Sequence, residues 1–80
     1  MALHDIVSPL PGTFYRRASP DAAPYVEAGG SVESGAVVGL VEVMKQFSDV
    51  ETDVAGRVTE ILVDDGEPVD AGQVLMRIEG

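Results

Sequence analysis

The chain has 80 residues, 45% of them hydrophobic, a formal net charge of −9 and no cysteine. This length predicts one small domain, residues 1–80, whose thin core leaves little room for an enclosed catalytic cleft. The acidic charge argues against nucleic acid and anionic membranes as partners, and no stretch approaches the roughly 20 apolar residues of a membrane span. The lack of thiols excludes disulfides and thiolate metal sites and favours the cytoplasm.

Short apolar runs separated by Gly, Pro, Asp and Ser predict an all-β fold. In chain order, strands are expected at Asp5–Ser8, Gly12–Tyr15, Val32–Glu33, Val37–Met44, Phe47–Asp53, Arg57–Val63, Val69–Asp70 and Val74–Glu79. The last strand alternates Val74, Met76 and Ile78 with largely polar neighbours, as a strand with one solvent face should. Glycines interrupt every stretch in which apolar residues recur with the period of a helix, so no helix is predicted.

An internal repeat organises these strands. Residues 26–42 align with residues 63–79 at a shift of 37 positions. The identical pairs are Val26/Val63, Gly29/Gly66, Val32/Val69, Gly35/Gly72, Val37/Val74 and Glu42/Glu79. The matched glycines are expected in tight turns at positive φ. Two similar halves predict two packed four-stranded antiparallel sheets, as a sandwich or flattened barrel, related by a pseudo-twofold axis.

The first half carries an insertion that the second half lacks. Residues 11–14 match residues 55–58 at a shift of 44, seven more than the main shift. The extra residues fall in segment 16–24, which reads Arg-Arg-Ala-Ser-Pro-Asp-Ala-Ala-Pro. Its two prolines and the Ser-Pro-Asp run predict a turn-rich protrusion rather than a strand.

The junction of the two halves holds the candidate functional residue. Glu42–Phe47 joins two of the longest predicted strands and is expected to be a hairpin tip. Lys45 within it is the only lysine in a chain with 14 acidic residues. An exposed hairpin lysine is usually only a solvated charge, but loops held by a rigid scaffold are where function concentrates. An enzyme that modifies one amine also benefits from a fixed presentation, so Lys45 is a candidate for covalent modification.

The residues around this lysine resemble a known family. Glu42-Val43-Met44-Lys45 resembles the Glu-Ala-Met-Lys biotin-acceptor motif of biotin carboxyl carrier domains. The similarity covers about residues 6–79. It is strongest in the segments Val7–Arg16, Ser19–Asp21, Ala55–Val58 and Ile61–Val69.

The resemblance implies a flattened β-sandwich with biotin amide-linked to Lys45. It also implies a short protruding thumb at about residues 16–24, as in the acetyl-CoA carboxylase branch of the family. The protein would be a non-catalytic carrier, not an enzyme. It would pass a carboxyl group from a biotin carboxylase to a carboxyltransferase that acts on acetyl-CoA or another acyl-CoA. A biotin protein ligase would attach the biotin.

The resemblance also names residues beside the acceptor. The acceptor motif comprises Glu42, Val43, Met44 and Gln46 around Lys45, and the thumb residues expected to contact biotin are Arg17, Ser19 and Pro20. Three of these depart from the family pattern. Val43 replaces the usual alanine and Gln46 the usual methionine, which bears on how efficiently a ligase works. Arg17 replaces a small hydroxyl residue, which bears on the contact between thumb and biotin.

Two alternatives remain open at this point. A lipoyl domain shares the fold and the hairpin lysine, but its motif typically reads Asp-Lys-Ala, which Met44 and Gln46 fit poorly. An unmodified hairpin adaptor or interaction module would not need a sole lysine at the turn.

The remaining polar and aromatic residues are predicted to lie at the surface or to pack, and not to form a site. The single histidine, His4, lies near the terminus without a patterned partner and is expected at the surface. The acids Asp49, Glu51 and Asp53 alternate along one strand and predict a solvated face. The four aromatic residues are assigned to the core or to packing at the base of the thumb, namely Phe14, Tyr15, Tyr25 and Phe47.

Overall fold

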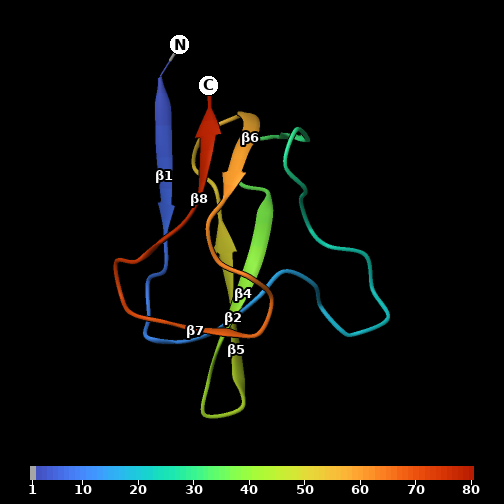
Figure 1. Ribbon diagram of the computed structural model, residues 1–80, viewed down its shortest axis with the longest axis vertical. Helices are drawn as coiled ribbons and strands as arrows, with labels where there is room; N and C mark the ends of the chain where they lie inside the picture. The colour runs from blue at the N-terminus through green and yellow to red at the C-terminus, as the bar shows by residue number, and fades with distance from the viewer. Residues whose placement is uncertain (1) are drawn as a thin grey trace.

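The computed structural model describes residues 2–80, which form eight strands (Figure 1). The strands are β1 Leu3–Val7, β2 Gly12–Tyr15, β3 Ser31–Val32, β4 Val37–Val43, β5 Gln46–Glu51, β6 Gly56–Ile61, β7 Glu67–Val69 and β8 Val74–Glu79. Every predicted strand is present, and the bounds differ by no more than a few residues. Within residues 2–80, no helix is long and apolar enough to cross a membrane.

The start of β7 was predicted two residues too late, at Val69 instead of Glu67. The reason is Pro68, which lacks a backbone N–H and usually argues against a strand. β7 lies at the edge of its sheet and pairs only with β2, where Pro68 lies opposite Thr13. An edge strand tolerates proline because its outer side needs no ladder donor.

The eight strands form two four-stranded antiparallel sheets, in the orders β1-β8-β6-β3 and β5-β4-β2-β7. Exchanging each strand with its equivalent in the other half (β1 with β5, β2 with β6, β3 with β7 and β4 with β8) converts one order into the other. The turn hydrogen bonds repeat as well: Gly29 N donates to Val58 O and Gly66 N donates to Phe14 O, both at 2.7 Å. The predicted two-sheet architecture and its pseudo-twofold repeat are confirmed.

The turns between the strands follow the same symmetry. The matched glycines all have φ between 84° and 90°, as predicted for Gly29, Gly35, Gly66 and Gly72. Two buried hydroxyls also correspond at the 44-residue shift. Ser8 Oγ donates to Leu10 O at 2.6 Å, and Thr52 Oγ1 donates to Val54 O at 2.8 Å. The repeat therefore extends further towards the N-terminus than the alignment of side chains indicates.

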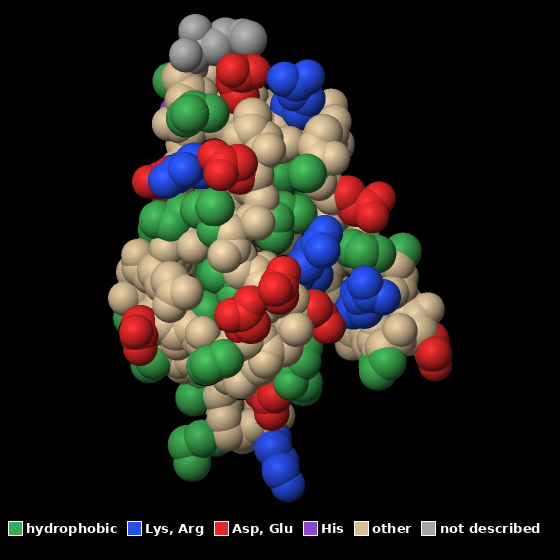
Figure 2. Space-filling model, viewed as in Figure 1, with side chains coloured by type: hydrophobic (Ala, Val, Ile, Leu, Met, Phe, Trp, Pro, Cys, Tyr) green, Lys and Arg blue, Asp and Glu red, His purple; other side chains and the backbone are tan. Residues whose placement is uncertain are grey.

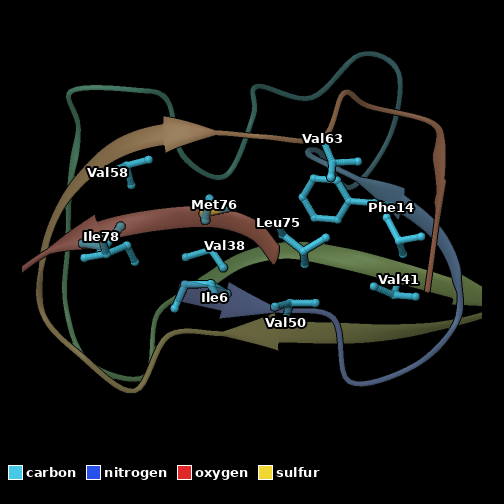
Figure 3. Packing of buried hydrophobic residues seen from close by; sticks show 12 residues of the cluster. Ile6, Phe14, Val38, Val41, Val50, Val58, Val63, Leu75, Met76 and Ile78 are labelled. Atoms are coloured by element: carbon cyan, nitrogen blue, oxygen red, sulfur yellow. The ribbon is translucent and has the colours of Figure 1, made fainter. Parts of the chain in front are cut away.

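The core lies between the two sheets (Figure 3). Phe14 of β2 and Leu75, Met76 and Ile78 of β8 are fully buried there, and Val58 of β6 faces them. Burying such side chains contributes roughly 1.5–3 kcal/mol each to stability. Of the four aromatic residues, only Phe14 belongs to this core. Tyr25 and Phe47 are 38% and 59% exposed and lie outside the core. Phe47 instead packs against Tyr15 at the base of the thumb, which is the second of the two expected roles.

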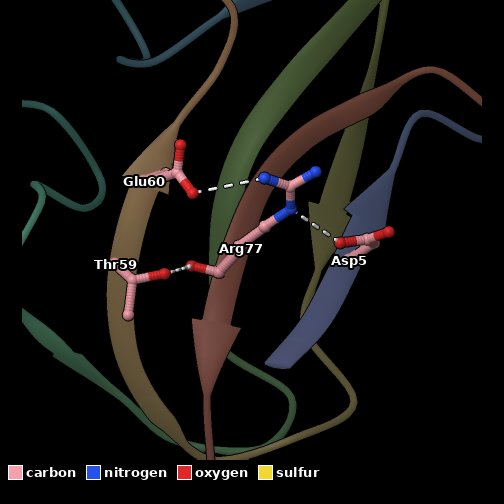
Figure 4. A network of polar contacts seen from close by, with 4 residues as sticks. All are labelled: Asp5, Thr59, Glu60 and Arg77. Atoms are coloured by element: carbon pink, nitrogen blue, oxygen red, sulfur yellow. Dashed lines mark hydrogen bonds and ion pairs between the residues drawn. The ribbon is translucent and has the colours of Figure 1, made fainter. Parts of the chain in front are cut away.

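The outer faces of the two sheets differ. On the sheet that contains β8, Arg77 pairs with Asp5 of β1 at 3.1 Å and with Glu60 of β6 at 3.2 Å (Figure 4). The equivalent position on β4 is Leu40, which is only 7% exposed but is not part of the core cluster. Leu40 lies opposite Tyr15 in the ladder, on the face away from the core.

The insertion predicted in the first half forms the protruding loop between β2 and β3 (Figure 1). Its neck is closed by a backbone hydrogen bond from Tyr25 N to Arg16 O at 2.8 Å. The Arg16 guanidinium adds a second hydrogen bond across the neck, in which it donates to Val26 O at 3.2 Å. A turn at the tip is closed by Ala22 N and Ser19 O at 3.1 Å. The thumb is thus a loop with its own internal bonds, as the prolines and Ser-Pro-Asp run predict.

Candidate cofactor-attachment site

The β4–β5 hairpin ends in a two-residue turn formed by Met44 and Lys45. Val43 and Gln46 are the last paired residues of the ladder. Met44 has φ 52° and Lys45 has φ 66°, and both values lie in the left-handed region. Positive φ at both central residues is the pattern of a type I′ turn, which usually contains Asn-Gly. Non-glycine residues adopt this region at a cost of about 1–2 kcal/mol each, so the paired strands must hold the turn in place.

The side chain of Lys45 is exposed at the end of this turn. Figure 2 shows one blue side chain projecting beyond the lower end of the molecule, where the β4–β5 turn lies in Figure 1. Within residues 2–80, no hydrogen bond or ion pair involves the Lys45 amine. A rigid hairpin therefore presents a single amine to solvent, as the sequence predicts.

Glu42, three residues before the lysine, is tied to the neighbouring strand. Tyr15 Oη of β2 donates a hydrogen bond to Glu42 Oε1 at 3.2 Å. This hydrogen bond, together with burial and the charges of Glu42 and Asp65, raises the pKa of Tyr15 above its usual value. The Tyr15 ring also packs against Phe47 of β5, with centroids 6.1 Å apart and a tilt of 52°. Tyr15 thus contacts both strands of the hairpin that carries Lys45.

A hollow of about 310 Å³ lies between the thumb and the hairpin, and we call it the thumb groove. Its lining residues are Tyr15, Arg17, Ala18, Ser19, Pro20, Phe47 and Asp65. The structure therefore brings the thumb residues Arg17, Ser19 and Pro20 to the same groove as Phe47, two residues from Lys45.

Asp65 is a member of this groove that was not predicted from the sequence. The Arg16 backbone N–H donates to Asp65 Oδ1 at 2.7 Å, which links the thumb neck to the turn before β7. The available signal was the Asp65-Gly66 pair, which predicts a tight turn but not its neighbours. Pairing of β2 with β7 is what brings this turn to the thumb.

A second hollow, of about 400 Å³, lies against the hairpin and shares no residue with the thumb groove. Leu10, Val43, Met44, Gln46 and Ser48 line it, and we call it the hairpin groove. None of these side chains is charged. This groove thus brings Leu10 next to the acceptor-motif residues Val43, Met44 and Gln46. Leu10 was not predicted from the sequence to be a site residue.

The acids of β5 and the segment after it, Asp49, Glu51 and Asp53, are exposed. Glu51 and Asp53 line a wide hollow with Asp5 of β1. Within residues 2–80, no group of three or more His, Cys, Asp or Glu side chains is arranged to hold a metal ion.

Comparison with known proteins identifies the family. The family model described as "Biotin-requiring enzyme" matches residues 4–78. The chain belongs to this biotin/lipoyl family. Its relatives include proteins named biotin carboxyl carrier protein of acetyl-CoA carboxylase. The chain is 47% identical to the one from Nostoc sp. over 77 residues and 46% identical to the one from Pseudomonas aeruginosa over 71 residues.

These matches cover 96% and 89% of the chain but only 42% and 46% of the two relatives, so the chain spans less than half of their length. A solved structure, the urea carboxylase of Kluyveromyces lactis, matches 99% of the chain with a TM-score of 0.79 at 26% identity. The match covers 6% of that much larger protein. The resemblance and the fold stated from the sequence are confirmed by the family model, the relatives and this structure.

Proposed function

We propose that residues 1–80 form a single biotinyl domain that carries biotin on Lys45 as the carrier of an acetyl-CoA carboxylase. The observation that carries this proposal is the sole lysine at the tip of a rigid type I′ hairpin, in a chain of the biotin/lipoyl family. The names of the relatives, biotin carboxyl carrier protein of acetyl-CoA carboxylase, support biotin rather than lipoate as the attached group.

The residues of the turn suit an amine that is modified and then carried between sites. An exposed amine without a partner in the described chain is free to become an amide nitrogen. The paired strands β4 and β5 fix the point from which the attached arm extends, which keeps its end at a high local concentration near partners. Biotin bound there would carry a carboxyl group from a biotin carboxylase to a carboxyltransferase. The domain itself acts as a non-catalytic carrier.

The two grooves beside the hairpin suggest which residues meet the attached group and the ligase. Arg17, Ser19 and Pro20 line the thumb groove, where aromatic and polar side chains suit a compact ring with polar edges. Glu42, Val43, Met44 and Gln46 surround the acceptor and would be covered by any ligase that reaches the amine. These side chains of the thumb and the acceptor motif are therefore assigned to binding of biotin and recognition by the ligase.

The proposed partners are a biotin protein ligase, a biotin carboxylase and a carboxyltransferase. A domain with a net charge of −9 favours partners with basic docking surfaces. The thiol-free, acidic composition suits a reducing compartment, and we place the function in the cytoplasm.

The test is enzymatic labelling of the purified chain. A biotin protein ligase with ATP and biotin should add one biotin per chain, located on Lys45 by mass spectrometry of peptides. A lipoate ligase with ATP and lipoate, run in parallel, should add nothing. Lipoylation without biotinylation would establish the lipoyl alternative, and the absence of both would favour an unmodified interaction module.

A further inference from the structure

The two methionines of the described chain have opposite environments. Met76 of β8 is fully buried in the core, whereas the Met44 side chain is 92% exposed. The other exposed large hydrophobic residues of the described chain reach at most 59%, at Leu3 and Phe47. Met44 owes its exposure to the turn, because its φ of 52° lies in the left-handed region at the very end of the hairpin. Its thioether is thus open to small reactants in solvent.

We propose that Met44 is a site of reversible oxidation to the sulfoxide, and that this oxidation slows modification of the adjacent Lys45. Peroxide is the oxidant class. The sulfur gives two electrons to the peroxide, the O–O bond breaks, one oxygen becomes the sulfoxide oxygen and the other leaves as water. Susceptibility of methionine to this reaction follows exposure, and sulfoxide reductases reverse it.

The consequence for Lys45 follows from the position of Met44, and this step rests on the proposed function. Met44 precedes Lys45 in the two-residue turn, so an enzyme that contacts the amine also covers the thioether. Met44 also lines the hairpin groove with Leu10 and Val43. Oxidation converts a flexible apolar side chain into a polar one. A partner surface shaped for the thioether would then have to bury an oxygen acceptor, which is unfavourable without a hydrogen bond.

The first experiment locates the oxidation. The chain is treated with dilute hydrogen peroxide, digested with trypsin and analysed by mass spectrometry. Cleavage after Lys45, Arg57 and Arg77 places Met44 and Met76 on different peptides. We expect Met44 to gain one oxygen at least ~10-fold faster than Met76. Equal rates at the two positions, with the fold intact by NMR, would overturn the assignment of Met44 as the selective site.

The second experiment measures the effect on Lys45. Chains carrying Met44 sulfoxide should accept biotin from the ligase about 10-fold more slowly than untreated chains, and a methionine sulfoxide reductase should restore the rate. Met44→Leu keeps an apolar side chain without sulfur, and its labelling should be unaffected by peroxide. An unchanged rate for the sulfoxide form, or an equal loss in Met44→Leu, would overturn the proposal. If untreated wild-type chain takes no label, the proposed function fails instead, and peptide mapping still tests the oxidation site.

Discussion

The two halves of the molecule share a backbone but use equivalent positions differently. Leu40 of β4 and Arg77 of β8 correspond in the repeat and occupy the outer faces of their sheets. Arg77 is partly exposed to solvent and bridges the exposed acids Asp5 and Glu60. Leu40 is buried beside Tyr15, the last residue of β2 before the thumb. At this position, the outer face of one sheet therefore carries exposed ion pairs, whereas the outer face of the other sheet carries a buried apolar side chain.

This difference separates features that both halves share, which build the scaffold, from features that only one half has. The shared features, such as the turn bonds of Gly29 and Gly66, build the scaffold twice. The unshared features are the thumb, which lines the thumb groove with Phe47, and the Met44-Lys45 turn, of which Met44 lines the hairpin groove. Changes in the exposed turn residues should therefore affect labelling without unfolding the chain, whereas changes in buried residues should act on stability.

The largest effect is expected from Lys45→Arg, which should abolish biotin labelling. Arginine keeps the positive charge, but its guanidinium stays protonated and is a poor nucleophile. The thermal unfolding curve should match that of wild type, because the Lys45 side chain is exposed. Intact-mass analysis after incubation with the ligase measures the outcome. Any biotin on the variant would mean that the acceptor lies elsewhere.

The next largest effect is expected on stability, and it should differ between substitutions at Leu40 and at Arg77. Leu40→Ala is expected to lower the free energy of unfolding by about 2–4 kcal/mol, since it removes buried methyl groups and leaves a cavity. Arg77→Ala should cost much less, and less again at high salt, because exposed ion pairs contribute little. Urea unfolding of the two variants compares them directly. Similar losses would show that the two outer faces are equivalent after all.

An intermediate effect is expected when the lysine moves by one residue. The double variant Met44→Lys with Lys45→Met keeps composition and charge but shifts the amine to the first position of the turn. Neighbouring residues direct their side chains differently, so a ligase that reads the shape of the hairpin should label it about 10-fold more slowly. Initial labelling rates, with NMR spectra to verify the fold, provide the measurement. Equal rates would show that the ligase reads only a short linear stretch.

The smallest effect should come from shortening the thumb. Deleting residues 17–23 and closing the gap with a short turn should leave a cooperatively folding domain that is still biotinylated, with a stability loss below about 1.5 kcal/mol. The second half folds the same strands without such an insertion, and the thumb makes its own internal bonds. Calorimetry and ligase labelling test this. Loss of cooperative unfolding would mean that the thumb is part of the core after all.

Much of the scaffold could be predicted because its determinants are local or repeated. Alternating apolar residues define strands, and the matched glycines define turns. The one-to-one match of Gly29 with Gly66 defines the symmetry, which then places Lys45 at the junction. The assignment of Lys45 to biotin stays a prediction, as do the roles of Arg17, Ser19 and Pro20.

The remaining features depend on contacts between residues far apart in the chain. Nothing local in Met44-Lys45 favours positive φ, and the ladder of β4 with β5 imposes it. Asp65 reaches the thumb only because β7 pairs with β2. Phe47 is apolar but exposed, because the strand parity that buries Val50 turns Phe47 outward. The sequence by itself thus determined the strands, the turns, the repeat and the position of the sole lysine. Only the tertiary structure decided which apolar residues are covered and which side chains share a groove, because sheet pairing, not sequence distance, sets those neighbours.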